Sequence, residues 1–149
     1  MKRTAERAER RKGFTLLELL VVVAIVAALI AIGVPKMRNY MTGVNITSMK
    51  TAAERGVAAE RGYFSSYNEY VDFTADNTSG TKAKVFDVGG GFKITVPPGV
   101  KVEGKKEDCS DGSKGFTISA SHKEVSDRYA QYDSCSDVAS IQIVNSSSK

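Results

Sequence analysis

The chain has 149 residues, of which 42% are hydrophobic and 26% charged, and its formal net charge is +4. This length accommodates one domain rather than two. The excess charge lies in residues 1–13, which carry six Lys or Arg and two Glu, whereas the remainder is balanced at 15 basic and 15 acidic residues. A basic face for nucleic acid is therefore not supported, and we predict no nucleic-acid site.

An apolar segment covers residues 14–34 and contains one acidic residue, Glu18. As a helix it would be roughly 31 Å long, about the thickness of a bilayer core. The basic head predicts a cytoplasmic N-terminus, because Lys and Arg favour that side of a membrane. The rest of the chain would then lie outside the cytoplasm, where Cys109 and Cys135 could form a disulfide.

A conventional secretory signal is the alternative for this segment. The small residues Ala31-Ile32-Gly33 could precede a cut, which would release a chain starting at Val34. However, the apolar segment is longer than the hydrophobic region of such signals, and no polar stretch precedes the supposed cut. The sequence therefore favours a retained apolar helix.

The junction between the head and the apolar segment, residues 11–18, reads RKGFTLLE. It resembles the N-terminal signature of type IV pilins and pseudopilins, and the likeness extends to Pro35. The resemblance implies that a prepilin peptidase removes residues 1–13, cutting between Gly13 and Phe14, and that Phe14 becomes N-methylated. It also implies storage in the inner membrane and then assembly, by a pilus machinery, of identical subunits into a surface filament.

Glu18 would be the fifth residue after that cut. A carboxylate in hydrocarbon is costly unless it is paired. The new amine of Phe14 would lie about one helical turn away, so Glu18 could pair with it or with the amine of a neighbouring subunit. The resemblance favours the second option, which makes Phe14 and Glu18 subunit-assembly residues. The alternative is that Glu18 lies at the membrane surface and contacts water.

Pro35 predicts a weak point in the helix. It has no N–H, so the carbonyl of Ala31 loses its helical partner, and we expect at least a kink. In assembled pili of the family this stretch can lose helicity, so the resemblance implies a helix break around Gly33 and Pro35.

Residues 36–67 continue as an amphipathic helical half, because apolar residues recur there at spacings of three and four. Gly43 and Gly56 weaken it, so it needs tertiary support. The pentapeptide AAERG occurs at residues 52–56 and 58–62, which does not indicate a repeat architecture. We expect the aromatic residues near the helix end to pack on the domain; an electron-transfer path is the alternative. They are Tyr63, Phe64, Tyr67 and Tyr70.

Residues 68–149 are predicted to form a C-terminal β-rich domain. Residues 68–91 should be a connecting segment. Alternation and turn residues predict strands at 92–96, 100–103, 116–121, 128–132 and 139–144. We therefore expect an α+β pilin fold, with the long helix packed on a small antiparallel sheet.

Cys109 and Cys135 would enclose 27 residues, counting both ends. A bridge would add about 3.5 kcal/mol to the free energy of unfolding by the chain-entropy estimate. In type IV pilins a C-terminal disulfide often bounds an exposed region; two free thiols are the alternative.

Catalytic and metal sites are not predicted. His122 is the single histidine, which excludes a multi-His zinc site within one chain. Some pseudopilins bind calcium in this region, but the aspartates near the cysteines lack EF-hand spacing. They are Asp108, Asp111, Asp127, Asp133 and Asp137. We predict no enzyme, no metal and no cofactor. Asn45, Asn77 and Asn145 begin N-glycosylation patterns, which arise often by chance.

The predicted function is that of a structural pilus subunit, with adhesion, twitching motility and DNA uptake all open. Close alternatives are a minor pilin and a type II secretion pseudopilin, although the two cysteines favour a pilin. A membrane-tethered enzyme or binding domain that never assembles is a different class. It would need a chemical constellation in residues 68–149, and none is evident.

Overall fold

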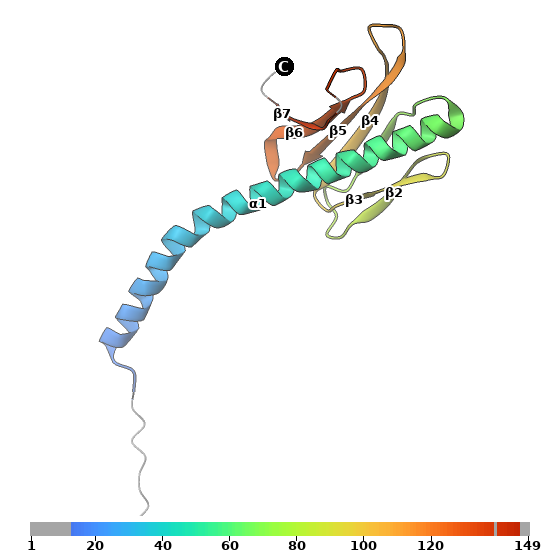
Figure 1. The fold of residues 1–149 in the computed structure, drawn as a ribbon. Coiled ribbons are helices and arrows are strands. Elements are labelled where there is room, and N and C mark those ends of the chain that lie inside the picture. The colour runs from blue at the N-terminus through green and yellow to red at the C-terminus, as the bar shows by residue number, and fades with distance from the viewer. Residues whose placement is uncertain (1–12, 139, 147–149) are drawn as a thin grey trace, which may run out of the picture. The chain divides into compact units, whose positions relative to one another are not determined.

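The computed structural model describes residues 13–138 and 140–146 (Figure 1). The chain divides into two compact units after Asn39. The helix α1 (Leu16–Tyr67) contributes to both units, and all strands among the described residues belong to the second unit. The strands are β1 (Phe73–Asp76), β2 (Lys84–Gly89), β3 (Phe92–Val96), β4 (Val100–Asp108), β5 (Lys114–His122), β6 (Val125–Asp133) and β7 (Gln142–Asn145). The α+β fold predicted from the sequence is confirmed.

The strands form two antiparallel sheets rather than one. Five strands pair in the order β1-β4-β5-β6-β7, while β2 and β3 pair only with each other. The expectation that residues 68–91 only connect was wrong, because both β1 and β2 lie there. Each of these strands buries a single side chain, Ala75 or Val88, so neither shows a clear apolar alternation. The last strand begins later than expected, at Gln142.

Small residues let the C-terminal half of α1 lie close to both sheets (Figure 1). A Cβ on Gly56 would lie 3.1 Å from Cγ2 of Ile118 in β5, and one on Gly62 would meet the ring of Phe92 in β3. The helix buries Met49, Ala52, Ala53, Val57 and Ala59 against the sheet residues. The tertiary support that the glycine-containing helix needs therefore comes from this contact.

The aromatic residues near the helix end pack on the sheet, as the sequence predicted. Ring centroids are 4.6 Å apart for Phe64 and Tyr70, 4.7 Å for Tyr70 and Phe116, and 5.5 Å for Phe116 and Tyr132. The series links α1 to β5 and β6. Arg61 lies at the end of this series of rings, where its Nη2 donates a hydrogen bond to Oη of Tyr132 at 2.9 Å. These contacts explain the aromatic cluster as core packing.

His122 ends β5 in a buried position, with 9% of its surface exposed. Its Nδ1 accepts a hydrogen bond from the backbone N–H of Glu124 at 3.1 Å, which requires Nδ1 to be unprotonated. The other side of the ring faces Gly99, where a Cβ would lie within 3.0 Å of Nε2. Burial lowers the pKa of His122, because the charged imidazolium is poorly solvated there.

This environment predicts an acid-dependent loss of stability. A lowered pKa in the folded state means that the contribution of His122 is complete above its ordinary value of 6.5 and is lost as the pH falls through the folded-state pKa. The loss should reach about 1.4 kcal/mol for each unit by which the pKa is lowered. Urea unfolding between pH 7.5 and 5 measures it, and His122→Asn should remove this component. An identical pH dependence in the variant would contradict the assignment.

Candidate functional site

The first turn of α1 is held by the side chain of Thr15, a role not predicted from the sequence. Oγ1 of Thr15 accepts a hydrogen bond from the backbone N–H of Glu18 at 3.2 Å, and the carbonyl of Thr15 accepts one from Leu19 at 3.2 Å. Thr15 is therefore the N-cap, and Glu18 occupies the third helical position of a Thr-x-x-Glu capping pattern. That spacing was visible in the sequence. An acidic residue in the first turn also complements the helix dipole.

Gly13 and Phe14 precede the helix, in a segment without regular structure. Phe14 is 81% exposed and Leu16 is 88% exposed, so neither side chain is covered by the described residues. Residues 1–12, which include most of the predicted leader, lie outside the described residues. The roles of Gly13, Phe14 and Glu18 in cleavage, methylation and assembly remain predictions.

The apolar part of α1 forms a continuous exposed surface. Every residue from 13 to 44 is exposed, including the large apolar side chains of the helix. Its most apolar 18-residue window has a mean hydropathy of 2.9 and no residue buried by the rest of the chain. By length and composition this segment could cross a membrane, and a soluble domain rarely leaves such a surface open.

Gly33 and Pro35 lie within α1 in the single chain. The helix is assigned through both residues, with Pro35 inside it. The missing N–H of Pro35 leaves the carbonyl of Ala31 without its usual helical donor. The loss of helicity predicted for this stretch concerns packed filaments and remains a prediction.

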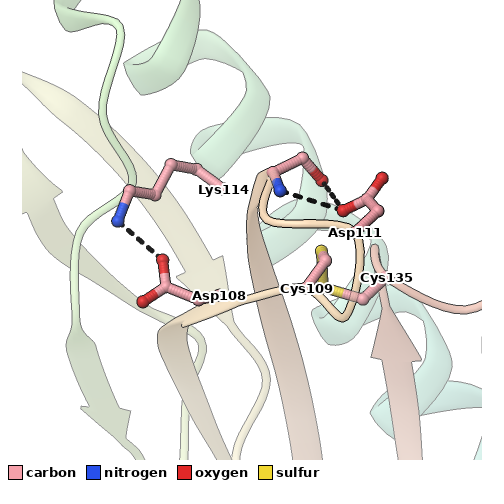
Figure 2. A network of polar contacts seen from close by, with 6 residues as sticks. Asp108, Cys109, Asp111, Lys114 and Cys135 are labelled. Carbon is pink, nitrogen blue, oxygen red and sulfur yellow. Dashed lines mark hydrogen bonds and ion pairs between the residues drawn. A yellow bond between two sulfur atoms is a disulfide. The ribbon is translucent and has the colours of Figure 1, made fainter.

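Cys109 and Cys135 form the disulfide, with their Cα atoms 5.3 Å apart (Figure 2). Cys109 follows β4 and Cys135 follows β6, and these strands flank β5 in the sheet. The bridge passes over Gly115 of β5, where a Cβ would lie within 3.0 Å of both Sγ atoms. The disulfide therefore links the segments that follow β4 and β6 across Gly115, a position that has no side chain.

The turn beside the disulfide is ordered by local polar contacts (Figure 2). Oδ1 of Asp111 accepts hydrogen bonds from the backbone and the hydroxyl of Ser113 at 2.9 and 2.7 Å. Nζ of Lys114 lies 2.6 Å from Oδ1 of Asp108, but both side chains are 72% exposed. Such an exposed pair contributes little to stability. Asp108 and Asp111 thus have protein partners of their own.

One acidic group near the bridge was a candidate for metal binding. Ligand atoms of Glu107, Asp133 and Cys135 lie within 4.8 Å of one another. The sulfur of Cys135 is committed to the disulfide, which leaves two carboxylates. Burial, and then the neighbouring charge and hydrogen bond of Asp133, raise the pKa of Glu107. Two carboxylates without a further ligand do not make a metal site, so we assign no cation to this group.

The pattern for glycosylation at Asn77 is not accessible in the folded chain. Asn77 is only 4% exposed, and its Nδ2 donates hydrogen bonds to the carbonyls of Lys82 and Val96, each at 2.9 Å. This side chain holds the turn after β1 against the end of β3. It is a structural residue, which the local sequence pattern did not reveal.

Comparison with known proteins points to one family. Residues 9–34 match the prokaryotic N-terminal methylation motif. The type IV major pilin protein PilA of Myxococcus xanthus is 36% identical over 64 residues, covering 43% of this chain and 29% of the relative. A fimbrial protein of Neisseria meningitidis serogroup A is 32% identical over 86 residues, covering 58% and 49%. Prepilin peptidase-dependent protein D of Escherichia coli is 46% identical over 41 residues, or 28% of each chain.

The chain spans about half or less of the length of these curated relatives. No solved structure matches it. The matched motif includes Gly13, Phe14 and Glu18, and the structure adds the long N-terminal helix packed on antiparallel sheets. On this evidence the chain carries the prokaryotic N-terminal methylation motif and is similar to type IV pilins and fimbrial proteins.

Proposed function

We propose that the chain is a prepilin whose mature form is a structural, non-catalytic subunit of a surface filament. A peptidase removes residues 1–13, the new amine of Phe14 is methylated, and residues 14–35 hold the subunit in the inner membrane until assembly. Residues 36–67 then link this segment to the C-terminal domain. The observation that carries the proposal is the exposed apolar part of α1, with one carboxylate in its first turn.

The exposed helix supports assembly for an energetic reason. In the membrane its side chains are solvated by lipid, and in a filament they can pack against the same segment of other subunits. Glu18 makes packing in the filament specific, because its carboxylate needs a cationic partner in an apolar environment. The amine of Phe14 in a neighbouring subunit supplies one. This pairing would set the stagger between subunits, which apolar contacts alone define poorly.

Minor pilins and type II secretion pseudopilins share these processing steps. The relatives with pilin and fimbrial names, and the disulfide across β5, favour a pilus subunit. The globular unit would then face solvent on the filament surface. Its partners would be identical subunits, the peptidase and the assembly machinery.

The processing step can be tested on the mature protein. We expect N-terminal sequencing and intact mass measurement to find a chain that begins at Phe14 and carries one additional methyl group. Gly13→Val should keep residues 1–13, because the new side chain blocks the cut. Gly33→Val is the matched control: it should leave the start at Phe14, whereas secretory processing would be blocked by it. A mature start at Val34, or an intact head in the wild-type chain, would contradict the proposal.

A further inference from the structure

The two copies of AAERG place their glutamates in opposite environments. Glu54 and Glu60 occupy the same position of an identical pentapeptide, six residues apart. At 3.6 residues per turn, six residues rotate the side chain by about 240°, so the copies face different sides of α1. Glu54 is exposed, whereas Glu60 is fully buried at 0% exposure. The burial of Glu60 is therefore imposed by tertiary packing.

Glu60 ties the chain that leaves the helix back to the helix. Its Oε2 accepts a hydrogen bond from the backbone N–H of Val71 at 3.2 Å. Val71 belongs to the connection between α1 and β1, residues 68–72, and packs against the core. The same connection has a second anchor, since Oδ1 of Asp72 accepts a hydrogen bond from the N–H of Lys106 in β4 at 2.7 Å.

The carboxyl group of Glu60 has no charge partner. Its Oε1 is buried without a hydrogen-bond partner among the described residues. None of the ion pairs in the described part of the chain includes Glu60. The adjacent Arg61 is directed to Oη of Tyr132 instead. An ionised Glu60 would thus be a buried, unpaired charge.

The titratable groups around Glu60 come from three elements. Asp72 and Tyr70, on the α1–β1 connection, interact with Glu60 itself, while Arg61 on α1 and Tyr132 on β6 interact with Tyr70. Burial raises the pKa of Glu60 and the charge of Asp72 raises it further, while the hydrogen bond from Val71 opposes them. Burial, together with the negative charge of Glu60, also raises the pKa of Tyr70.

We propose that Glu60 is a proton-dependent anchor for the α1–β1 connection. The neutral carboxyl group holds Val71 against the helix. Ionisation places an unpaired charge in the core beside Asp72 and loosens residues 68–72. Because the pKa is raised in the folded state, the stabilising contribution is complete below the ordinary value of 4.5 and is lost as the pH rises through the folded-state pKa. The anchor acts within one subunit and does not depend on the proposed function.

NMR on the full chain in detergent micelles can measure both the ionisation of Glu60 and the exchange of the Val71 amide. We expect the side-chain carboxyl carbon of Glu60 to titrate above the ordinary range for glutamate. The protection factor of the Val71 amide, which corrects for intrinsic pH effects on exchange, should fall on the order of tenfold for each pH unit between 4.5 and that titration, and should level off above it. In Glu60→Gln this protection should be independent of pH, since the amide oxygen accepts the same hydrogen bond without ionising.

Glu54→Gln is the matched control, because it makes the same change in the identical pentapeptide at an exposed position. It should reproduce the wild-type dependence of Val71 on pH. An ordinary titration of Glu60, or pH-independent protection of Val71 in the wild-type chain, would overturn the proposal. If Glu60→Gln does not fold, the wild-type carboxyl titration and the Glu54→Gln comparison still decide.

Discussion

Replacing Glu18 with glutamine is expected to reduce the yield of assembled filaments on the order of tenfold or more. Glutamine has nearly the same shape but cannot form an ion pair with the amine of a neighbouring Phe14. Loss of 1.4 kcal/mol per contact changes an equilibrium constant about tenfold, and removing one partner of a buried pair usually costs more than that. Each subunit in a filament would lose one such pair. Sheared surface material, examined by electron microscopy and immunoblotting, gives the yield.

Glu18→Gln should leave the start of α1 unchanged. The cap of α1 uses the hydroxyl of Thr15 and the backbone N–H of Glu18, and neither is changed by the substitution. We therefore expect normal cleavage, methylation and membrane levels of the variant subunit. Glu54→Gln, at an exposed position of the second unit, is the control and should assemble normally. Glu18→Gln filaments of normal yield and length would exclude the pairing mechanism.

Replacing Gly115 with alanine should prevent the disulfide from closing. The new Cβ would occupy space within 3.0 Å of both sulfur atoms and of Oγ of Ser134. Ser134 cannot easily move away, because its Oγ also accepts a hydrogen bond from the backbone N–H of Phe116 at 2.7 Å. Without the bridge, the 27-residue loop loses about 3.5 kcal/mol of stabilisation by the chain-entropy estimate.

Two measurements follow this change. Alkylation and mass measurement should find free thiols in Gly115→Ala, and urea unfolding in detergent should show a loss at least as large as in the double variant Cys109→Ser with Cys135→Ser. Gly43→Ala is the control, because a Cβ there meets no atom within 4 Å. It should keep the bridge and change stability by at most about 1 kcal/mol. A fully oxidised Gly115→Ala chain of normal stability would show that the glycine is not required.

Features that depend on neighbours along the chain were predictable, and features that depend on the sheet were not. The apolar segment, the acidic residue in its first turn and the long helix are local patterns. The strands β1 and β2 were missed because each buries a single residue, Ala75 or Val88. Gly115 lies under the disulfide only because β4 and β6 flank β5, and no local sequence pattern predicts this strand order.

Glu60 and Asn77 show the same limit at single positions. Glu60 is preceded and followed by the same residues as the exposed Glu54, so its burial cannot be inferred from its sequence neighbours. Asn77 begins a modification pattern, yet its amide is used to close a turn against β3. In both cases the role is decided by the strand or connection that packs against the residue.

The N-cap formed by Thr15 has a consequence for the proposed maturation. Both groups of this hydrogen bond lie after the cut, so losing the head leaves the starting point of α1 in place. Precursor and product would then share one backbone shape at their membrane end. Proteolysis would act mainly as a change of charge: it deletes six cationic and two anionic side chains and moves the terminal ammonium group to Phe14, four residues before Glu18.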